Sequence, residues 1–201
     1  MRLGSQPGSG QDQLAVRLLD AARVVVARHG LRRTSMEEVA RAAHCSRPTA
    51  YKHYGSRDRL LAELFVREVH RYLEGLPAPT SVATGPGGLL EEIFVHTLRH
   101  VRGHPLVQAV AAADPQGLSE LLALDGGRVL QVITTGLCDY MGGLAEVGAL
   151  RPGVPVEVAT EAFVRMVLSF LLFPRLVADP DDEDAVRAIF RASVSEGAGP
   201  R

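Results

Sequence analysis

Apolar side chains recur along this chain with the spacing of α-helices. Between residues 11 and 29, leucines, valines and alanines fall three or four positions apart, as expected for one buried helical face. No later stretch alternates between apolar and polar residues as a half-buried strand would. The fold class predicted is therefore all-α. Nine or ten helices are expected, at about 11–29, 36–43, 46–54, 56–74, 89–102 and 105–113, then one that begins near 115 and gives way around 125–127, a long one that continues to about 147, and two more at 155–174 and 182–196.

Residues 34–54 predict two short helices joined by a tight turn. Two pairs of a hydroxyl and a carboxylate stand three positions apart, which is the spacing of a capping box at a helix start. His44 falls at the turn, and histidine is one of the few non-glycine types enriched in the left-handed conformation that turns often need. Ser46 is a favourable N-cap for the second helix. The two capping pairs are Thr34 with Glu37 and Ser35 with Glu38.

The second of these helices has an apolar side and a side rich in hydrogen-bond donors. Ala50 and Tyr54, four positions apart, are expected to pack inward. A helix that presents its N-terminus and such side chains is typical of the recognition element of a helix-turn-helix, which enters the major groove of duplex DNA. Arg57, at the N-terminus of the next helix, could hold a phosphate. The outward side chains are Arg47, Thr49, Tyr51, Lys52 and His53. The simpler alternative is a helical hairpin with a solvated charged face.

Residues 28–61 resemble the TetR family of bacterial transcriptional repressors. The resemblance is carried by residues 28–31 (RHGL), 34–40 (TSMEEVA), 43–54 (AHCSRPTAYKHY) and 56–61 (SRDRLL), and it covers about the first 75 residues. It implies an N-terminal three-helix helix-turn-helix DNA-binding domain, followed by a larger helical domain for ligand binding and dimerisation. Together with the hydroxyl pair at the start of the second helix, which family members use for phosphates, the candidate DNA-binding residues are Thr34, Ser35, Ser46, Arg47, Pro48, Thr49, Tyr51, Lys52, His53 and Arg57.

Three positions depart from the family's pattern. His44 replaces the usual turn glycine, and Ala50 replaces a larger aliphatic residue. Glu37 stands where many members carry a basic residue, so no favourable phosphate contact is expected from it. These departures leave the architecture intact but make the operator sequence harder to predict by analogy.

Charge is distributed unevenly along the chain. Residues 1–75 contain 13 Lys and Arg against 8 Asp and Glu, a balance of +5, and residues 76–201 contain 9 against 15, a balance of −6. The two values add to the net charge of −1 for the whole protein. A basic N-terminal part suits a polyanionic partner with strong salt dependence, and the acidic remainder should stay away from it.

Composition and chain order suggest the domain organisation. Residues 1–10 are expected to be a disordered tail, 11–56 the DNA-binding domain, 57–75 a connecting helix and 76–201 the ligand-binding and dimerisation domain, entered through a Pro- and Gly-rich linker at 76–88. The N-terminus is too polar for a signal peptide, and no apolar run is expected to span a membrane. With two cysteines and no CxxC motif, a reducing cytoplasm is the expected location.

The second domain offers candidates for a ligand pocket and a dimer interface. A methionine and aromatic set at helical spacing is more often plain core, so this alternative stays open for each ligand candidate. Residues 155–172 are apolar on nearly every side and so should be buried on every side, partly against a second subunit; a monomer with one large core is the alternative. The candidates for an apolar ligand are Phe94, Leu98, Val101, Leu137, Tyr140, Met141, Phe163 and Met166. By resemblance, the candidates for the dimer interface are Ala159, Val167, Leu171, Val186, Ile189 and Phe190.

Other chemistry finds little support. His96 and His100 have the spacing of a metal-ligand pair, but no Cys, Asp or Glu reinforces them, so neither a metal nor a cofactor is expected. Motifs of zinc proteases, serine hydrolases and phosphate-binding loops are absent from the sequence. We therefore expect a non-enzymatic, homodimeric transcriptional regulator that binds a palindromic DNA operator and a small apolar ligand, most simply as a repressor. The alternative is a helical small-molecule-binding protein or enzyme with a vestigial DNA-binding end.

Overall fold

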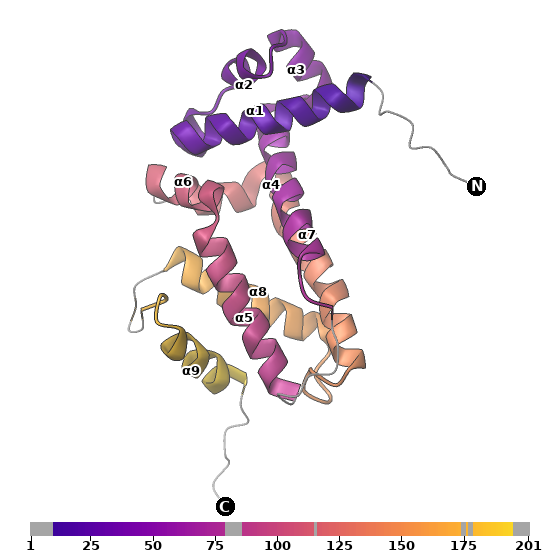
Figure 1. Cartoon of the computed structure of the whole chain (residues 1–201), viewed down its shortest axis with the longest axis vertical. Coiled ribbons are helices and arrows are strands. Elements are labelled where there is room, and N and C mark those ends of the chain that lie inside the picture. The colour runs from indigo at the N-terminus through magenta and orange to yellow at the C-terminus, as the bar shows by residue number, and fades with distance from the viewer. Residues whose placement is uncertain (1–9, 79–85, 115, 174–175, 177–178, 195–201) are drawn as a thin grey trace, which may run out of the picture. The chain divides into compact units, whose positions relative to one another are not determined.

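The computed structural model describes residues 10–78, 86–114, 116–173, 176 and 179–194, and these residues form helices and turns without any strand (Figure 1). The predicted tail up to residue 9, residues 79–85 of the linker and residues 195–196 of the last predicted helix lie outside this part. The all-α class is confirmed. The helices are α1 (Gly10–Arg33), α2 (Met36–Ala42), α3 (Arg47–Tyr54), α4 (Arg57–Glu74), α5 (Pro86–Gly103), α6 (Pro105–Ala113), α7 (Gly117–Glu146), α8 (Val156–Leu172) and α9 (Glu183–Val194).

The chain divides into two compact units, each built from segments that are distant in the sequence. The described residues of the first unit fall within Met1–Arg71 and Pro105–Leu130, and those of the second within Tyr72–His104 and Gln131–Arg201. This grouping differs from the linear division predicted from the sequence, because α6 packs against α1. The compact units are therefore not successive segments of the chain.

Gly30 interrupts α1 and allows α6 to approach it. Its φ of 75° and ψ of 177° are non-helical, in a region of backbone space that is essentially restricted to glycine. A Cβ atom at this position would lie 2.3 Å from the Cβ of Ala113 in α6. The helix predicted over residues 11–29 is confirmed up to Gly30, after which helical structure resumes to Arg33. Glycine is required here both for the backbone conformation and for the close packing.

Ion pairs add to this packing within the first unit. At the end of α1, the Arg32 guanidinium pairs with Asp114 at 2.5 Å and also with Glu120. Arg128 of α7 pairs with Glu63 of α4 at 2.6 Å. Three helices of this unit, α1, α4 and α7, and the residue that follows α6 are thus joined by charged groups as well as by apolar contact. Exposed pairs of this kind each contribute about 0–1 kcal/mol, so packing remains the main stabilising factor.

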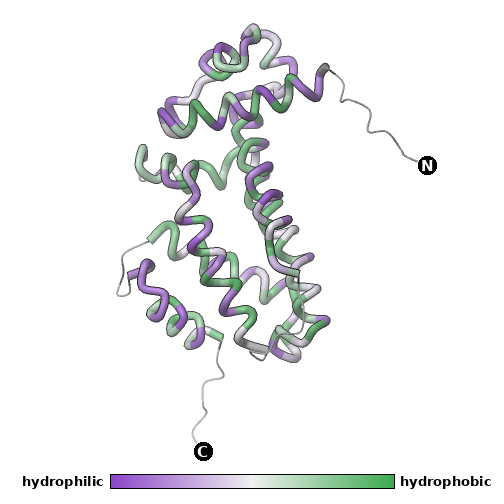
Figure 2. Tube along the Cα trace, viewed as in Figure 1, coloured by the Kyte–Doolittle hydropathy of each residue, from purple (hydrophilic) through white to green (hydrophobic). Residues whose placement is uncertain are grey.

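In the second unit, aromatic side chains form the core between α5, α8 and α9. Phe94 is fully buried; its ring stacks on Phe190 with 4.9 Å between centroids and meets Phe163 edge-on at 5.5 Å. Polar and hydrophobic residues alternate around α9 (Figure 2), which buries Val186 and Phe190. This amphipathic pattern explains why α9 packs on α5 with a single face.

A carboxylate clamp fastens α9 to α5 beside this core. Glu91 is 7% exposed, and both of its oxygens accept hydrogen bonds from Arg191, at 2.6 and 2.7 Å. Arg187 donates to Glu91 at 3.1 Å and to Glu92 at 2.7 Å. The hydrogen bonds from Arg191, opposed by desolvation and helped by Arg187, hold the pKa of the Glu91 carboxyl below its ordinary value.

Helix α8 is buried on one side only within this single chain. Thr160, Phe163, Val164 and Val167 are buried, whereas Val158 is 56% exposed. The expectation of burial on every side is therefore not met by the chain alone. A second subunit would be needed to cover the open face of this apolar helix.

Helix α7 is the one described helix whose length and composition would allow it to cross a membrane, which the sequence analysis did not anticipate. Its backbone is non-helical from Leu124 to Gly127, as predicted for the Asp-Gly-Gly break, so it consists of two shorter helices. Beyond the break, Leu137, Met141 and Leu144 are buried at helical spacing. These features are those of a helix that packs inside a folded unit.

Candidate DNA-binding interface

The start of α2 and the turn after it hold the next helix in place. Ser35 Oγ accepts a hydrogen bond from the Glu38 backbone N–H at 3.2 Å, and the Glu38 carboxylate accepts one from the Ser35 N–H at 3.1 Å. His44 has a φ of 54°, so the left-handed turn is confirmed. The Cys45 N–H donates back to the Ala40 carbonyl at 3.0 Å, which closes the turn. One of the two predicted capping boxes, the Ser35–Glu38 box, is thereby confirmed.

Helix α3 is fixed at its start and along its inner side. Ser46 Oγ accepts a hydrogen bond from the Thr49 N–H at 3.2 Å, as a predicted N-cap should. Ala50 is fully buried, and Tyr54 is 9% exposed with its hydroxyl donating to the Ala15 carbonyl at 3.2 Å. The absence of a larger side chain at Ala50 lets α3 lie close to the rest of the unit. These contacts determine which side of α3 faces outward.

The outward side of α3 carries the predicted recognition residues. Arg47, Pro48, Tyr51 and Lys52 are exposed, and Thr49 and His53 are half-buried. The Arg47 guanidinium lies 5.4 Å from the centre of the Tyr51 ring, within the range of a cation–π contact. This contact holds two long side chains together at the N-terminal half of α3, which is the part that meets base edges in helix-turn-helix proteins.

Thr34 and Arg57 are engaged within the protein. Thr34 is 2% exposed, and its hydroxyl donates to the Gly30 carbonyl at 2.8 Å rather than forming a capping pair with Glu37. Arg57 donates to the backbone carbonyls of Thr34 and Leu31 and pairs with Asp58. These acceptors lie 23 and 26 residues before Arg57, so no local sequence pattern predicts them.

Acidic and basic groups near α3 partly neutralise one another. Glu37 pairs with Arg41 one turn later on α2 at 3.3 Å, and both side chains are largely exposed. The negative charge of Glu37, expected to be unfavourable beside a phosphate, is therefore balanced locally. Lys52, the only lysine in the chain, remains exposed on α3.

The predicted ligand residues lie in the core of the second unit. Five of them are at most 5% exposed: Phe94, Leu98, Leu137, Met141 and Phe163. Val101, Tyr140 and Met166 are half-buried. The Tyr140 hydroxyl donates to the Pro77 carbonyl at 2.8 Å, and burial raises the pKa of this phenol. Five of the eight predicted ligand residues therefore belong to the buried core, and the other three lie half-buried at its edge.

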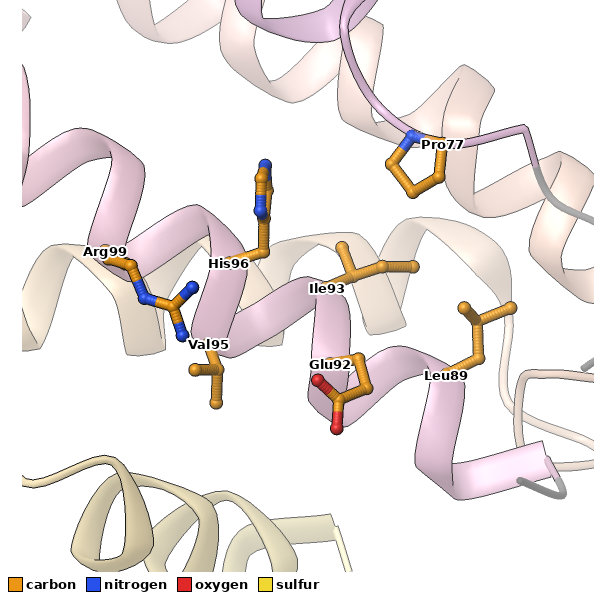
Figure 3. Close-up of a pocket in the computed structure, with 7 residues that line it drawn as sticks. All are labelled: Pro77, Leu89, Glu92, Ile93, Val95, His96 and Arg99. Carbon is orange, nitrogen blue, oxygen red and sulfur yellow. The ribbon is translucent and has the colours of Figure 1, made fainter. Parts of the chain in front are cut away.

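A recess of about 230 Å³ lies on α5, and none of the eight predicted ligand residues lines it. Figure 3 shows Leu89, Ile93 and His96 pointing toward the segment that contains Pro77. The lining residues are Pro77, Leu89, Glu92, Ile93, Val95, His96 and Arg99. Its two strongest charges are already paired, Glu92 with Arg187 and Arg99 with Glu183. Ligand pockets for small molecules usually exceed this volume.

Three histidines on and after α5 form a row with Tyr72. The ring centres of His96 and His100 are 6.4 Å apart, those of His100 and His104 5.9 Å, and Tyr72 lies 4.6 Å from His100. Desolvation, with the positive charges of His104 and His96, lowers the pKa of His100. Burial raises the pKa of Tyr72 to about 12, although its hydroxyl bonds to Thr97 at 2.6 Å. Among the described residues, no group of three or more potential ligands is arranged to hold a metal ion.

The predicted dimer residues fall into three groups by exposure. Val167, Val186 and Phe190 are buried in the chain's own core, whereas Ala159 and Leu171 are half-buried. Ile189 is exposed, as are other apolar side chains near it in the sequence. Among the described residues of α8, α9 and the segment between them, the large apolar side chains that are exposed are Val158, Phe173, Leu176, Ile189 and Val194. A second subunit would reach this exposed group first.

Both the N-terminal and the C-terminal part of the chain match known protein families. Residues 18–64 match the family described as bacterial regulatory proteins, tetR family, and residues 89–193 match the bacterial tetracyclin repressor C-terminal domain. An uncharacterized HTH-type transcriptional regulator of Mycobacterium tuberculosis is 30% identical over 180 residues, covering 88% of this chain and 82% of its own.

Solved structures share the fold. The TetR-family transcriptional repressor QsdR of R. erythropolis has a TM-score of 0.68 at 17% identity, with 94% of this chain and 98% of that chain covered. The transcriptional regulator FadR of Bacillus subtilis, in complex with stearoyl-CoA, has a TM-score of 0.59 at 13% identity, with 90% and 99% covered. At these low sequence identities, the similarity shows a shared fold and nothing more.

Proposed function

Because the chain belongs to the TetR family of bacterial regulatory proteins, we propose that this transcriptional regulator is a ligand-responsive repressor that binds a palindromic operator as a homodimer. The observation that supports this most directly is the outward face of α3, where Arg47, Tyr51 and Lys52 are exposed while Ala50 and Tyr54 anchor the helix. The proposal includes no catalytic step and no membrane, and it locates the protein with its operator in the cytoplasm.

In the proposed complex, α3 enters the major groove with its N-terminal half first. Arg47 can donate two parallel hydrogen bonds to a guanine edge, and the Thr49 methyl group can contact thymine. Tyr51 and Lys52 have donors suited to phosphate oxygens, which position the helix without reading sequence. Two copies of α3 related by a twofold axis would read half-sites about one helical turn apart, ~34–36 Å.

The operator can be found by selecting duplexes from a randomised DNA pool with the full-length protein. The recovered sequences should contain two inverted half-sites with centres about 10 base pairs apart. Recovery of no preferred duplex would favour a helical small-molecule-binding protein whose DNA-binding end has lost its role.

Replacing Lys52 with alanine should weaken binding to the selected duplex about tenfold at moderate salt, with unchanged dimerisation. If Lys52 neutralises one phosphate in each subunit, the slope of log K against log salt should fall in magnitude by about 0.9 per phosphate. Fluorescence anisotropy across a salt series measures both quantities. The matched control is Arg71→Ala, which removes one exposed charge from the end of α4. An unchanged slope for the Lys52 variant, or loss of its dimer in sedimentation, would contradict the proposed role.

For the dimer, we propose that a second copy covers the open face of α8 and the outer side of α9. Val158 and Ile189 are exposed there, and a twofold contact places the same patch of each subunit against the other. The half-buried Ala159 and Leu171 would lie at the margin of this patch. Val167, Val186 and Phe190 would support it from the core beneath.

For the ligand, we propose a small apolar molecule that enters the core of the second unit near Met141 and Phe163. The five residues of this set are buried, and the rings of Phe94 and Phe163 are in contact, so a ligand must bind a conformation in which these side chains have separated. A ligand that prefers this conformation lowers operator affinity if the conformation also binds DNA less well. The stearoyl-CoA complex of the Bacillus subtilis relative supports an apolar ligand class.

A further inference from the structure

We propose that Arg57 is a positioning residue for DNA binding: it fixes the connection between α1 and α2 through backbone carbonyls and does not bind a phosphate itself. This inference rests on the proposed DNA-binding function and assigns Arg57 a different role within it. An arginine at the N-terminus of a helix, beside a recognition helix, would ordinarily be taken as a phosphate ligand.

Each nitrogen of the Arg57 side chain is already engaged. Nε donates to the Thr34 carbonyl at 2.6 Å, and Nη2 donates to the Leu31 carbonyl. Nη1 donates to the Asp58 carboxylate at 2.7 Å. A guanidinium has five N–H donors, and three of them are used here. A phosphate bound bidentately through Nε and Nη2 would displace both carbonyls, and the Thr34 carbonyl would lose this hydrogen bond. A buried acceptor left without a hydrogen bond is costly, so the observed arrangement is favoured.

The two carbonyls belong to the chain between α1 and α2. Leu31 lies in the last turn of α1, where a cation is favourable, and its carbonyl also accepts a hydrogen bond from the Thr34 N–H at 3.2 Å. Thr34 directly precedes Ser35, the N-cap of α2. A planar guanidinium can bind both carbonyls at once, which the single ammonium of lysine cannot do in the same geometry.

The surroundings of Thr34 make this connection part of the recognition apparatus. Leu31 and Thr34 are 3% and 2% exposed, and the Thr34 hydroxyl donates to the carbonyl of Gly30. The buried connection leads directly into α2, and α2 packs against α3. Arg57, as the first residue of α4, therefore joins three helices at the point where the orientation of α2 is set. A change at Arg57 should displace α2 and, with it, the outward face of α3.

The test compares Arg57→Gln, Arg57→Lys and the wild-type protein on a duplex selected by the wild type. Positioning predicts that both variants bind at least about tenfold more weakly, with the salt slope unchanged because no phosphate contact is lost. Dissociation constants are normalised to the active fraction from stoichiometric titration, so a merely unfolded population would not alter them. The matched control is Arg59→Gln, which removes an exposed charge from the same turn of α4.

Hydrogen exchange of the free proteins supplies a second measurement. The Thr34 N–H bonds to the Leu31 carbonyl at 3.2 Å, so exchange over residues 31–39 should become faster in both Arg57 variants and stay unchanged in Arg59→Gln. If Arg57→Lys keeps wild-type affinity while Arg57→Gln reduces the salt slope by about 0.9 per subunit, with normal exchange in both, Arg57 binds a phosphate and the inference is wrong. If the wild type selects no duplex, the proposed function fails, and the exchange data then show separately whether Arg57 holds the connection.

Discussion

The variant Gly30→Ala is expected to destabilise the first unit by about 2–6 kcal/mol, enough to unfold many domains of this size. The Gly30 backbone, with φ 75° and ψ 177°, lies in a region that costs a non-glycine residue about 1–3 kcal/mol. The added Cβ would also lie 2.3 Å from the Ala113 Cβ, and relieving such overpacking costs about 1–3 kcal/mol more. Chemical denaturation followed by circular dichroism measures the change.

Two further variants separate the backbone cost from the packing cost. Gly55 has a φ of 74°, and no atom lies within 4 Å of a Cβ built there, so Gly55→Ala should show mainly the backbone cost. The double variant Gly30→Ala with Ala113→Gly removes the colliding methyl group and should recover part of the lost stability. If Gly30→Ala costs no more than Gly55→Ala, or if the double variant recovers nothing, the close contact between α1 and α6 is not stabilising.

Replacing Glu91 with glutamine is expected to destabilise the second unit by about 2–3 kcal/mol at neutral pH. The change leaves Arg187, which is largely buried, without one of its carboxylate partners, and it removes both charged hydrogen bonds to Arg191. Breaking a buried pair from one side costs about 3–5 kcal/mol, and the exposure of Arg191 lowers that figure here. The matched control is Glu183→Gln, which breaks an exposed pair with Arg99 between α9 and α5 and should change stability by at most about 1 kcal/mol.

The effect of Glu91 should depend on pH in a definite direction. Hydrogen bonds from Arg191 lower the pKa of the folded Glu91 carboxyl below 4.5, so its stabilising contribution is present above pH 4.5 and is lost as the pH falls through the lower, folded value. The difference in melting temperature between wild type and Glu91→Gln should therefore be constant at neutral pH and shrink in acid. A difference that persists unchanged to pH 2 would show that it does not arise from the charge of Glu91.

Features that depend on neighbouring residues could be predicted from the sequence. The Ser35–Glu38 capping box, the Ser46 N-cap and the left-handed His44 involve groups within three or four positions of one another. Each is therefore specified by local residue types. The break in α7 at residues 124–127 is likewise encoded by an Asp-Gly-Gly sequence that favours positive φ.

Features that depend on distant residues could not be predicted in this way. Glu91 bonds to Arg191, which lies 100 positions later in the sequence. Arg57 can reach its acceptors only when α4 is packed against the end of α1. Thr34 was expected to face a phosphate because its residue type suits one, but the fold buries it. A side chain's chemistry suggests several partners, and packing selects among them. This is why the outward face of α3 was better anticipated than the roles of Thr34 and Arg57.

The assignment of Pro105–Leu130 to the first unit has a consequence for protein engineering. Chimeric regulators are commonly made by joining the N-terminal part of one protein to the C-terminal part of another at a single junction. A junction after residue 75 of this chain would transfer α1 without its contacts from the second segment. These are Ala113, against which Gly30 packs, and Asp114 and Glu120, with which Arg32 pairs. A transplant that keeps its original DNA specificity should therefore carry this second segment as well, grafted into the recipient as an internal replacement.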